Sequence, residues 1–468
     1  MTDPDKPAGS DRTQVDETAA DETELDGQVD EPAPDDEHTL ASLREWIFKN
    51  DLRLILVLSA GMYLLFTWLS LMAGFRGGGL LNRLQTITFF ATLFAMLALA
   101  LNLQWGYAGM ANLGIAGFMA VGVYSMALIS MPVDGSPPGL GLPLPIGIIV
   151  GVLMATLVGA IAALPALRLR ADYLAIVTLA FGEIIRRVVR SRQLEEFTVG
   201  GQELGLGGVS GPSLPPDPVQ WVLYGDPAGR ADPTAIGELV FSVGQALGVR
   251  STVMAGIVYA LLLVVATVGF YWLLVRVGNS PFGRVLKAIR EDELAASALG
   301  KDIRLFKIKA FALGCGLMGL ASILWFMERG SVSPDTLVPE LTFFIFVALI
   351  LGGSGSNTGA VVGGIVFGSL LWRGPGFLQR IIDANFDRPS QPDTVFDAFR
   401  SVDGFVGYFF SDVNITALQF VILGVILMYL MQRRPDGLLG HRTEIAASID
   451  LSVRETDTAA RDGREENR

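Results

Sequence analysis

Long apolar runs, separated by short charged or glycine-rich segments, make up most of the middle of this chain. Runs such as Leu52–Ala73, Leu144–Leu167 and Thr252–Val275 reach the roughly 20 residues that a helix needs to cross a bilayer. Because hydrocarbon offers no partner to backbone N–H and C=O groups, each run is expected to be a helix. A mean hydropathy of +0.47 with only 18% charged residues agrees, and it excludes an ordinary soluble domain.

The remaining runs complete an all-α polytopic fold with about ten transmembrane helices. They are Leu84–Leu103, Leu113–Met131, Tyr173–Val189, Ala310–Met327, Leu341–Trp372 and Ile415–Met431. Glycine-rich segments interrupt this series, so we expect broken or re-entrant helices among the spans.

The net charge of −12 is unevenly divided along the chain. Residues 1–40 carry net −12 and residues 443–468 carry net −3, which leaves +3 for residues 41–442. Both tails are acidic and poor in aromatic residues, so we expect them to be disordered. A transmembrane domain is therefore predicted to span residues 41–442.

A charged segment at residues 276–309 separates two of the apolar runs. It holds eight Lys or Arg residues against four acids, which predicts a cytoplasmic location by the positive-inside rule. Its middle, Pro281–Leu299, is typical of a helix, with Gly300 as the stop. Either the segment only sets the membrane topology, or it is a docking element that another protein moves. The second reading is favoured by its apolar residues, which are Leu286, Ile289, Leu294 and Leu299.

Threading the runs outward from this segment places both termini in the cytoplasm. The long acidic loops at 190–250 and 373–412 then fall outside. The arginines from Arg186 to Arg192 disagree with the scheme, because they would lie at the outer face. Either that stretch is re-entrant or its arginines line a cavity.

Two glycine-rich breaks, Gly106–Gly117 and Gly352–Gly359, occur at membrane depth. Paired broken helices are the best sequence indication of a translocation site, whereas close packing of helices through small residues is the plainer reading for most of the glycines. For Asn112 and Asn357 the two readings are balanced. Tyr107 is either an interface anchor or a gate residue.

Glu183 is the single acid inside an apolar run. An intramembrane carboxylate is by default a functional candidate, but Arg186 and Arg187 follow at helical spacing and favour an ion pair. The candidate lining of a translocation path is then Tyr107, Gly109, Asn112, Gly114, Thr178, Glu183, Gly352, Gly353 and Asn357.

The chain has no visible enzyme site. There is no G-x-x-x-x-G-K-[ST] phosphate loop, so the chain does not itself hydrolyse ATP in the usual way. Both histidines, His38 and His441, lie outside the apolar body, and no metal or serine-hydrolase motif is present. We expect no bound cofactor or metal and no nucleic-acid partner.

Several motifs together resemble one family. They are GYAGMANLGIAGFMAVGVYS (106–125), LRLRADYLAIVTLAFGEIIR (167–186), TVGGQELGL (198–206), SPFGRVLKAIREDELAASALGKD (280–302), LGGSGSNTGAVVGG (351–364) and RPDGLLG (434–440). The chain is similar to the LivM-type permease subunits of branched-chain amino-acid ABC importers, and the likeness covers most of residues 106–440 in matching order.

The resemblance assigns the charged segment to the cytoplasmic coupling element of these importers. Its general pattern, Glu-Ala-Ala-x-x-x-Gly, aligns with Leu294 to Gly300, so a leucine stands in the place of the glutamate. The residues implied to couple to an ATPase are Arg290, Glu291, Glu293, Ala295, Ala296 and Gly300.

The resemblance also implies partners: a second related permease subunit, two ATPase subunits that bind ATP and Mg, an extracellular substrate-binding protein, and the lipid of the plasma membrane. Alternatives are an importer of urea or amides within the same family, or an ion-coupled secondary amino-acid transporter that uses Glu183.

Overall fold

The fold was analysed in a computed structural model, which describes residues 51–166, 171–225 and 232–385 and shorter stretches between 394 and 439. All of these belong to the unit that begins at Asp51. The predicted acidic tails and most of the predicted span Ile415–Met431 lie outside the described residues.

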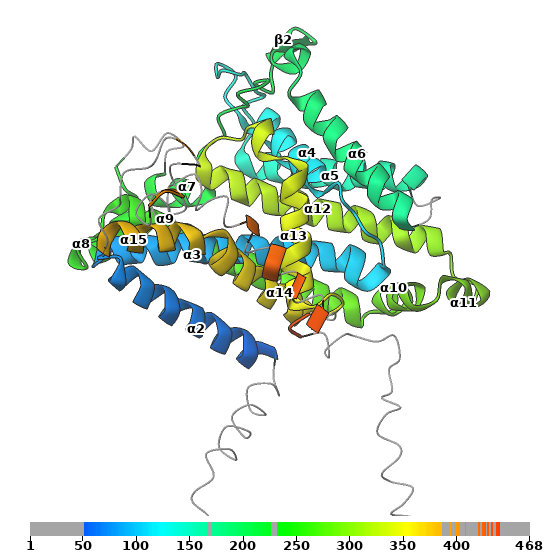
Figure 1. The fold of residues 1–468 in the computed structure, drawn as a ribbon. Coiled ribbons are helices and arrows are strands. Elements are labelled where there is room, and N and C mark those ends of the chain that lie inside the picture. Colours follow the sequence, from blue (N-terminus) through cyan, green and yellow to red (C-terminus); the bar gives the residue numbers. More distant parts are fainter. Residues whose placement is uncertain are drawn as a thin grey trace, which may run out of the picture. The chain divides into compact units, whose positions relative to one another are not determined.

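Most of the described chain is helical (Figure 1), which confirms the all-α polytopic prediction. Within it, seven helices are long and apolar enough to cross a membrane. They are built from α2 (Asp51–Met72), α3 (Gly78–Leu101) with the π-helix η1 (Asn102–Gly106), α5 (Leu144–Ala166), α9 (Ser251–Asn279), α12 (Ile303–Arg329), α13 (Pro339–Gly352) preceded by the 3₁₀ turn η3 (Pro334–Thr336), and α14 (Asn357–Val366) with the π-helix η4 (Phe367–Trp372) and α15 (Gly374–Asn385).

Two further helices fall on predicted spans. α4 (Ile115–Ser130) has 16 residues and is shorter than the predicted run Leu113–Met131, because the glycine-rich break takes up its start. α6 (Ala171–Val189) covers the predicted run Tyr173–Val189 and carries Arg186 and Arg187 in its last turn.

The core is centred on α3 and α12, which are mostly buried. α12 packs against α3, α4 and α5, while α9 and α14 pack against α3. Small residues permit this closeness: a Cβ on Gly122 of α4 would lie 2.6 Å from the Cα of Gly319 in α12. α2 is mostly exposed, as expected of a helix that contacts lipid along most of its length.

Short elements connect α6 to α9. They are η2 (Arg192–Leu194), β1 (Phe197–Val199), β2 (Gln202–Leu204), α7 (Pro218–Tyr224) and α8 (Ala235–Ala246). One of them, α7, packs into the core through Val219 and Leu223. β1 and β2 form an antiparallel hairpin, with Gly200 and Gly201 at φ of 61° and 87° in its turn. The hairpin lies in the motif Thr198–Leu206.

The charged segment forms two helices, α10 (Pro281–Glu291) and α11 (Glu293–Ala298). The stretch Pro281–Leu299, typical of a helix by its sequence, is therefore helical on both sides of Asp292 but not at that residue. That residue is extended, with φ of −153°, and its carboxylate accepts hydrogen bonds from the N–H groups of Leu294 and Ala295. Local capping thus outweighs helix propensity. Gly300, at φ of 73°, follows the end of α11 as the expected helix stop.

Candidate functional site

The first glycine-rich break opens inside the bundle, where α3 changes to the π-helix η1 and the chain then runs without regular structure until α4. η1 is almost completely buried and carries Asn102 and Gln104. π-helical turns are frequent at functional sites because they displace side chains from the α-helical register. Gly109 makes the following turn, at φ of 66°.

The second break lies between α13 and α14. Gly352 ends α13, Gly353 follows at φ of 108°, and the hydroxyl of Ser356 caps α14 by accepting from the N–H of Gly359. A Cβ on Gly352 would lie 1.8 Å from the carbonyl oxygen of Gly359, so only glycine fits at this position. The two helix ends therefore meet backbone to backbone.

Asn102 and Asn357 join the two breaks. The amide of Asn102 donates to the side-chain oxygen of Asn357 over 3.2 Å, and its own oxygen accepts from the N–H of Gly355 over 2.8 Å. Asn357 in turn donates to the phenolic oxygen of Tyr107 over 2.6 Å. All three side chains are buried. Buried polar groups need such partners, and a satisfied network fixes the relative position of its members.

A second chain of hydrogen bonds connects the first break to α6, α12 and α13. Asn112 donates to Gln104, which donates to the carbonyl oxygen of Phe311. The hydroxyl of Thr178 accepts from the N–H of Leu113, and that of Thr342 accepts from the N–H of Ala116. Backbone N–H groups of the break are thus satisfied by side chains of two other helices, α6 and α13.

Glycines of the first break also pack closely against α6. A Cβ on Gly114 would lie 2.4 Å from the carbonyl oxygen of Thr178, and one on Gly117 would lie 2.5 Å from the Cα of Gly182. Close packing through small residues and a buried polar network therefore occur together, and the two readings of the glycine-rich breaks do not exclude each other.

The charged segment contacts the first break directly. Arg290 of α10 donates to the carbonyl oxygen of Gly106, the last residue of η1. The ammonium nitrogen of Lys287 lies 5.1 Å from the centre of the Tyr107 ring, within cation–π range. A Cβ on Gly109 would lie 3.4 Å from the side chain of Arg290. One face of α10 is therefore part of the buried site.

The opposite face of the segment is open. Leu294 is 82% exposed and Leu299 is 78% exposed, whereas Leu286 and Ile289 are buried. Glu291, Ala295 and Gly300 are exposed as well, Ala296 is buried, and Glu293 forms an ion pair with Lys307 at 2.6 Å. Of the predicted coupling residues, Arg290 and Ala296 face the bundle and the others face away from it.

Glu183 lies apart from the asparagine network, in a group of ion pairs. Its carboxylate accepts from Arg186 at 2.7 and 2.8 Å and from Arg187 at 2.9 Å, and Arg190 pairs with Asp335 at 2.8 Å. This arrangement supports the ion-pair reading of Glu183. The arginines from 186 to 190 thus have acidic partners on their own helix and at η3.

The predicted path residues fall into two groups. Tyr107, Asn112, Gly114, Thr178, Gly352, Gly353 and Asn357 are buried around the two breaks, whereas Glu183 and Gly109 lie at the margin. Their role in lining a path stays a prediction, since in this conformation the breaks are packed closed.

The sequence reasoning missed four residues of the site: Asn102, Gln104, Lys287 and Thr342. Asn102 and Gln104 are amides at the end of a long apolar run, which is an available signal for buried hydrogen bonding. Lys287 precedes Arg290 by three residues and so shares its helix face. The family's closing motif also adds to the site, because the N–H groups of Leu438 and Leu439 donate to the carbonyl oxygens of Leu351 and Gly352.

Acids, histidines and cysteine do not gather at the site. Within the described ranges no group of three such residues is placed to hold a metal ion, and Cys315 is a buried free thiol beside Gln104. The site is built from amides, hydroxyls and backbone groups, together with the cations Lys287 and Arg290 of α10.

Comparison with known proteins identifies relatives of this chain. The permease LivM of the high-affinity branched-chain amino acid transport system of Escherichia coli (strain K12) is 34% identical over 278 residues, 58% of this chain and 59% of the relative. The probable branched-chain amino acid transport permease LivM of Methanocaldococcus jannaschii is 28% identical over 299 residues, 58% of this chain and 75% of the relative. No solved structure matches.

This chain spans about 59% of the length of the first of these relatives. The profile of one family, described as the permease component of the branched-chain amino acid transport system, matches residues 83–380, well over half of the chain. That range contains both breaks, the charged segment and the whole buried network. The chain belongs to this family of permease components and is a multi-pass membrane protein.

Proposed function

We propose that this chain imports branched-chain amino acids as one subunit of an ABC importer in the plasma membrane. Its partners would be a second related permease, two ATPases that bind ATP and Mg, and an extracellular binding protein. Both termini and the charged segment would lie in the cytoplasm, in agreement with the basic surplus of residues 276–309. The relatives' printed names support the cargo.

The observation that carries the proposal is the contact of Arg290 with Gly106. It connects a segment with an exposed apolar face to the end of the π-helix where the bundle is broken. An ATPase that docks on Leu294 and Leu299 and moves the segment would pull on Arg290 and on the Lys287–Tyr107 contact. The force would then reach Asn357 through its hydrogen bond to Tyr107.

Transport follows from two conformations of this network. In the described conformation the breaks are joined by Asn102, Asn357 and Tyr107, and the region is closed. Displacement of the charged segment would separate the breaks and expose their backbone and amide groups to the cargo. ATP binding in the partner subunits acts by stabilising one conformation over the other, and no covalent step occurs in this chain.

The test is uptake of radiolabelled leucine into proteoliposomes that hold the complete complex, with ATP inside or absent and with or without a protonophore. Uptake that needs internal ATP and survives the protonophore supports the proposal. Uptake that ignores ATP and collapses with the ion gradient contradicts it. ATP-driven uptake of urea in place of leucine would keep the mechanism and replace the cargo.

A matched pair of variants examines the coupling step. Arg290→Ala removes the donor to Gly106, whereas Arg284→Ala removes an exposed arginine from the same helix. We expect Arg290→Ala to uncouple ATP hydrolysis from uptake and Arg284→Ala to leave uptake near the parent level. Equal effects of the two substitutions would contradict the transmission route.

A further inference from the structure

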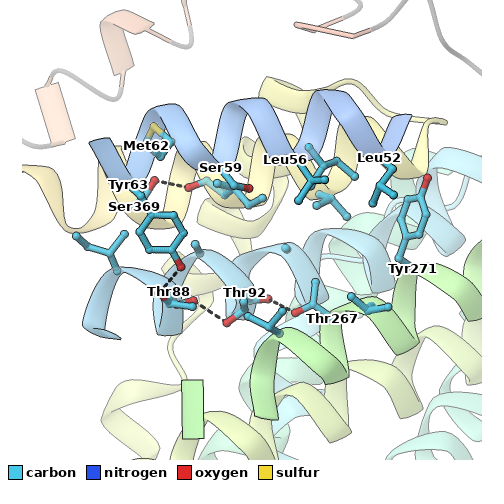
Figure 2. Close-up of a pocket in the computed structure, with 18 residues that line it drawn as sticks. Leu52, Leu56, Ser59, Met62, Tyr63, Thr88, Thr92, Thr267, Tyr271 and Ser369 are labelled. Carbon is cyan, nitrogen blue, oxygen red and sulfur yellow. Dashed lines mark hydrogen bonds between the residues drawn. The ribbon is translucent and has the colours of Figure 1, made fainter. Parts of the chain in front are cut away.

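An apolar cavity of about 370 Å³ lies between α2 and the rest of the bundle, against α3, α9 and α14 (Figure 2). Its walls include Leu52 and Leu56 of α2, Ile87 of α3, Val264 of α9 and Ile365 of α14. The volume is more than twice the roughly 150 Å³ of an engineered cavity that takes up benzene. The cavity therefore has room for a flexible hydrocarbon chain.

Hydroxyl groups in the wall do not make the cavity polar. Thr88, Thr92 and Thr267 each donate to the carbonyl oxygen four residues earlier, at 2.8, 2.7 and 2.8 Å. The phenol of Tyr63 lies 2.5 Å from the hydroxyl of Thr88 (Figure 2). None of the residues described as lining the cavity is charged. A zwitterionic amino acid would find no partner for its charges here.

Three arginines gather near one end of this cavity. The guanidinium carbon of Arg83 lies 4.6 Å from the centre of the Phe75 ring and that of Arg380 lies 5.9 Å from the same ring. The guanidinium carbon of Arg373 lies 4.9 Å from the ring of Phe90. These three residues, Arg83, Arg373 and Arg380, are named the arginine cluster below. α3, the turn after η4, and α15 each contribute one of them.

The arginine cluster forms no ion pair in the part of the chain that the structure describes. None of the ion pairs found there uses Arg83, Arg373 or Arg380, and the buried Nε of Arg83 has no hydrogen-bond partner. The arginines are close enough for their charges to act on one another, with Glu328 the one carboxylate near Arg373. Positive charges held close together beside an apolar cavity are stabilised by a bound anion.

Helix geometry relates the arginine cluster to the cavity. Arg83 precedes the cavity residue Ile87 by one turn on the same face of α3, and Arg373 follows the cavity residue Ser369 by four residues. From Arg83 to Ala95, the deepest α3 residue of the wall, the helix rises about 18 Å. One leaflet of a bilayer contributes about half of the roughly 30 Å hydrocarbon core. The lengths match.

We propose that the cavity and the arginine cluster together bind one anionic phospholipid, with an acyl chain in the cavity and the phosphate on the guanidinium groups. By the threading that puts the charged segment in the cytoplasm, this lipid belongs to the outer leaflet, because the arginine cluster lies at the opposite end of α3 from Gly106. Positive charge on that side is otherwise disfavoured, and a bound phosphate offsets it. The lipid would hold α2 against the bundle.

Native mass spectrometry of the full chain in detergent tests the site without requiring transport. The protein is given phosphatidylglycerol or phosphatidylcholine with identical acyl chains. We expect several-fold greater retention of phosphatidylglycerol. Millimolar inorganic phosphate should not displace it, since free phosphate has no chain for the cavity. Equal retention of the two lipids, or displacement by phosphate or by leucine, would overturn the proposal.

Matched variants separate the two halves of the site. Arg83→Gln should lower phosphatidylglycerol retention several-fold and Arg83→Lys should restore most of it, whereas Arg192→Gln, an exposed arginine elsewhere, should have no effect. Ser59→Trp fills the cavity and should also lower retention, unlike Leu64→Trp on the exposed face of α2. A normal lipid signal from a folded Arg83→Gln or Ser59→Trp protein would contradict the assignment, and thermal unfolding of each variant identifies those that fold.

Discussion

The side-chain amide of Asn357 donates to the phenolic oxygen of Tyr107 across 2.6 Å, although 250 residues separate them in the chain. Asn357 begins α14, and Tyr107 follows the π-helix η1 at the end of α3. This bond, with that between Asn102 and Asn357, makes the two breaks one structural unit. Under the proposed function, this pair would be a contact that is made in one of the two conformations.

Tyr107→Phe removes the acceptor and leaves the buried amide of Asn357 short of a partner. A buried polar group that loses its hydrogen bond costs about 1–3 kcal/mol, so the variant should unfold at a lower temperature in detergent. Tyr173→Phe, on an exposed tyrosine of α6, is the control and should leave the midpoint unchanged. Equal midpoints for Tyr107→Phe and the parent protein would contradict the network.

Gly352→Ala should prevent the two helix ends of the second break from meeting. The added carbon would lie 1.8 Å from a backbone oxygen, which cannot move as a side chain does. Overpacking costs about 1–3 kcal/mol even among side chains, so a larger loss is expected here. Gly269→Ala in α9 meets nothing within 4 Å and should stabilise the protein by about 0.5–1 kcal/mol. Recovery of folded protein by size-exclusion chromatography distinguishes them.

Leu286 of α10 is buried and Leu294 of α11 is exposed, so the two leucines should respond differently to truncation. Leu286 is fully buried, so Leu286→Ala should destabilise the chain by about 2–5 kcal/mol. Leu294 is 82% exposed, so Leu294→Ala should change stability by no more than about 0.5 kcal/mol while reducing co-purification of the ATPase subunits. Undiminished co-purification with Leu294→Ala would remove this surface from the docking site.

Glu183→Gln tests whether this carboxylate serves transport or structure. Its partner Arg186 has a side chain only 17% exposed, so the substitution should cost about 1–3 kcal/mol of stability. Arg187 is 74% exposed, and Arg187→Gln should cost less than about 1 kcal/mol. ATP-driven leucine uptake by folded Glu183→Gln should persist. Loss of uptake with an intact fold would favour the ion-coupled alternative.

Gly300→Pro tests whether the backbone turn after α11 is needed for transport. Gly300 has φ of 73°, a conformation that proline cannot adopt. The variant should abolish uptake, because the charged segment would be reoriented, while the two permease subunits still assemble. Uptake at the parent level would show that the segment does not transmit movement, and pull-down of the second permease controls for assembly.

Local features of the sequence were enough to identify the spans, the two breaks, the charged segment and the candidate residues Tyr107, Asn112, Thr178 and Asn357. Apolar length and the shortage of backbone partners in hydrocarbon act on consecutive residues, so they can be read along the chain. The pairing of Glu183 with Arg186 and Arg187 also followed from helical spacing.

Only the tertiary structure decided which distant groups meet. It joined Asn357 to Tyr107, turned Arg290 inward to Gly106, and left Leu294 and Leu299 outside. It also showed the helix break at Asp292, where a single carboxylate bonds two backbone N–H groups. Such outcomes depend on the packing of α3, α10 and α14 against one another, because the partners of a buried polar group are set by which helices meet and not by its neighbours in sequence.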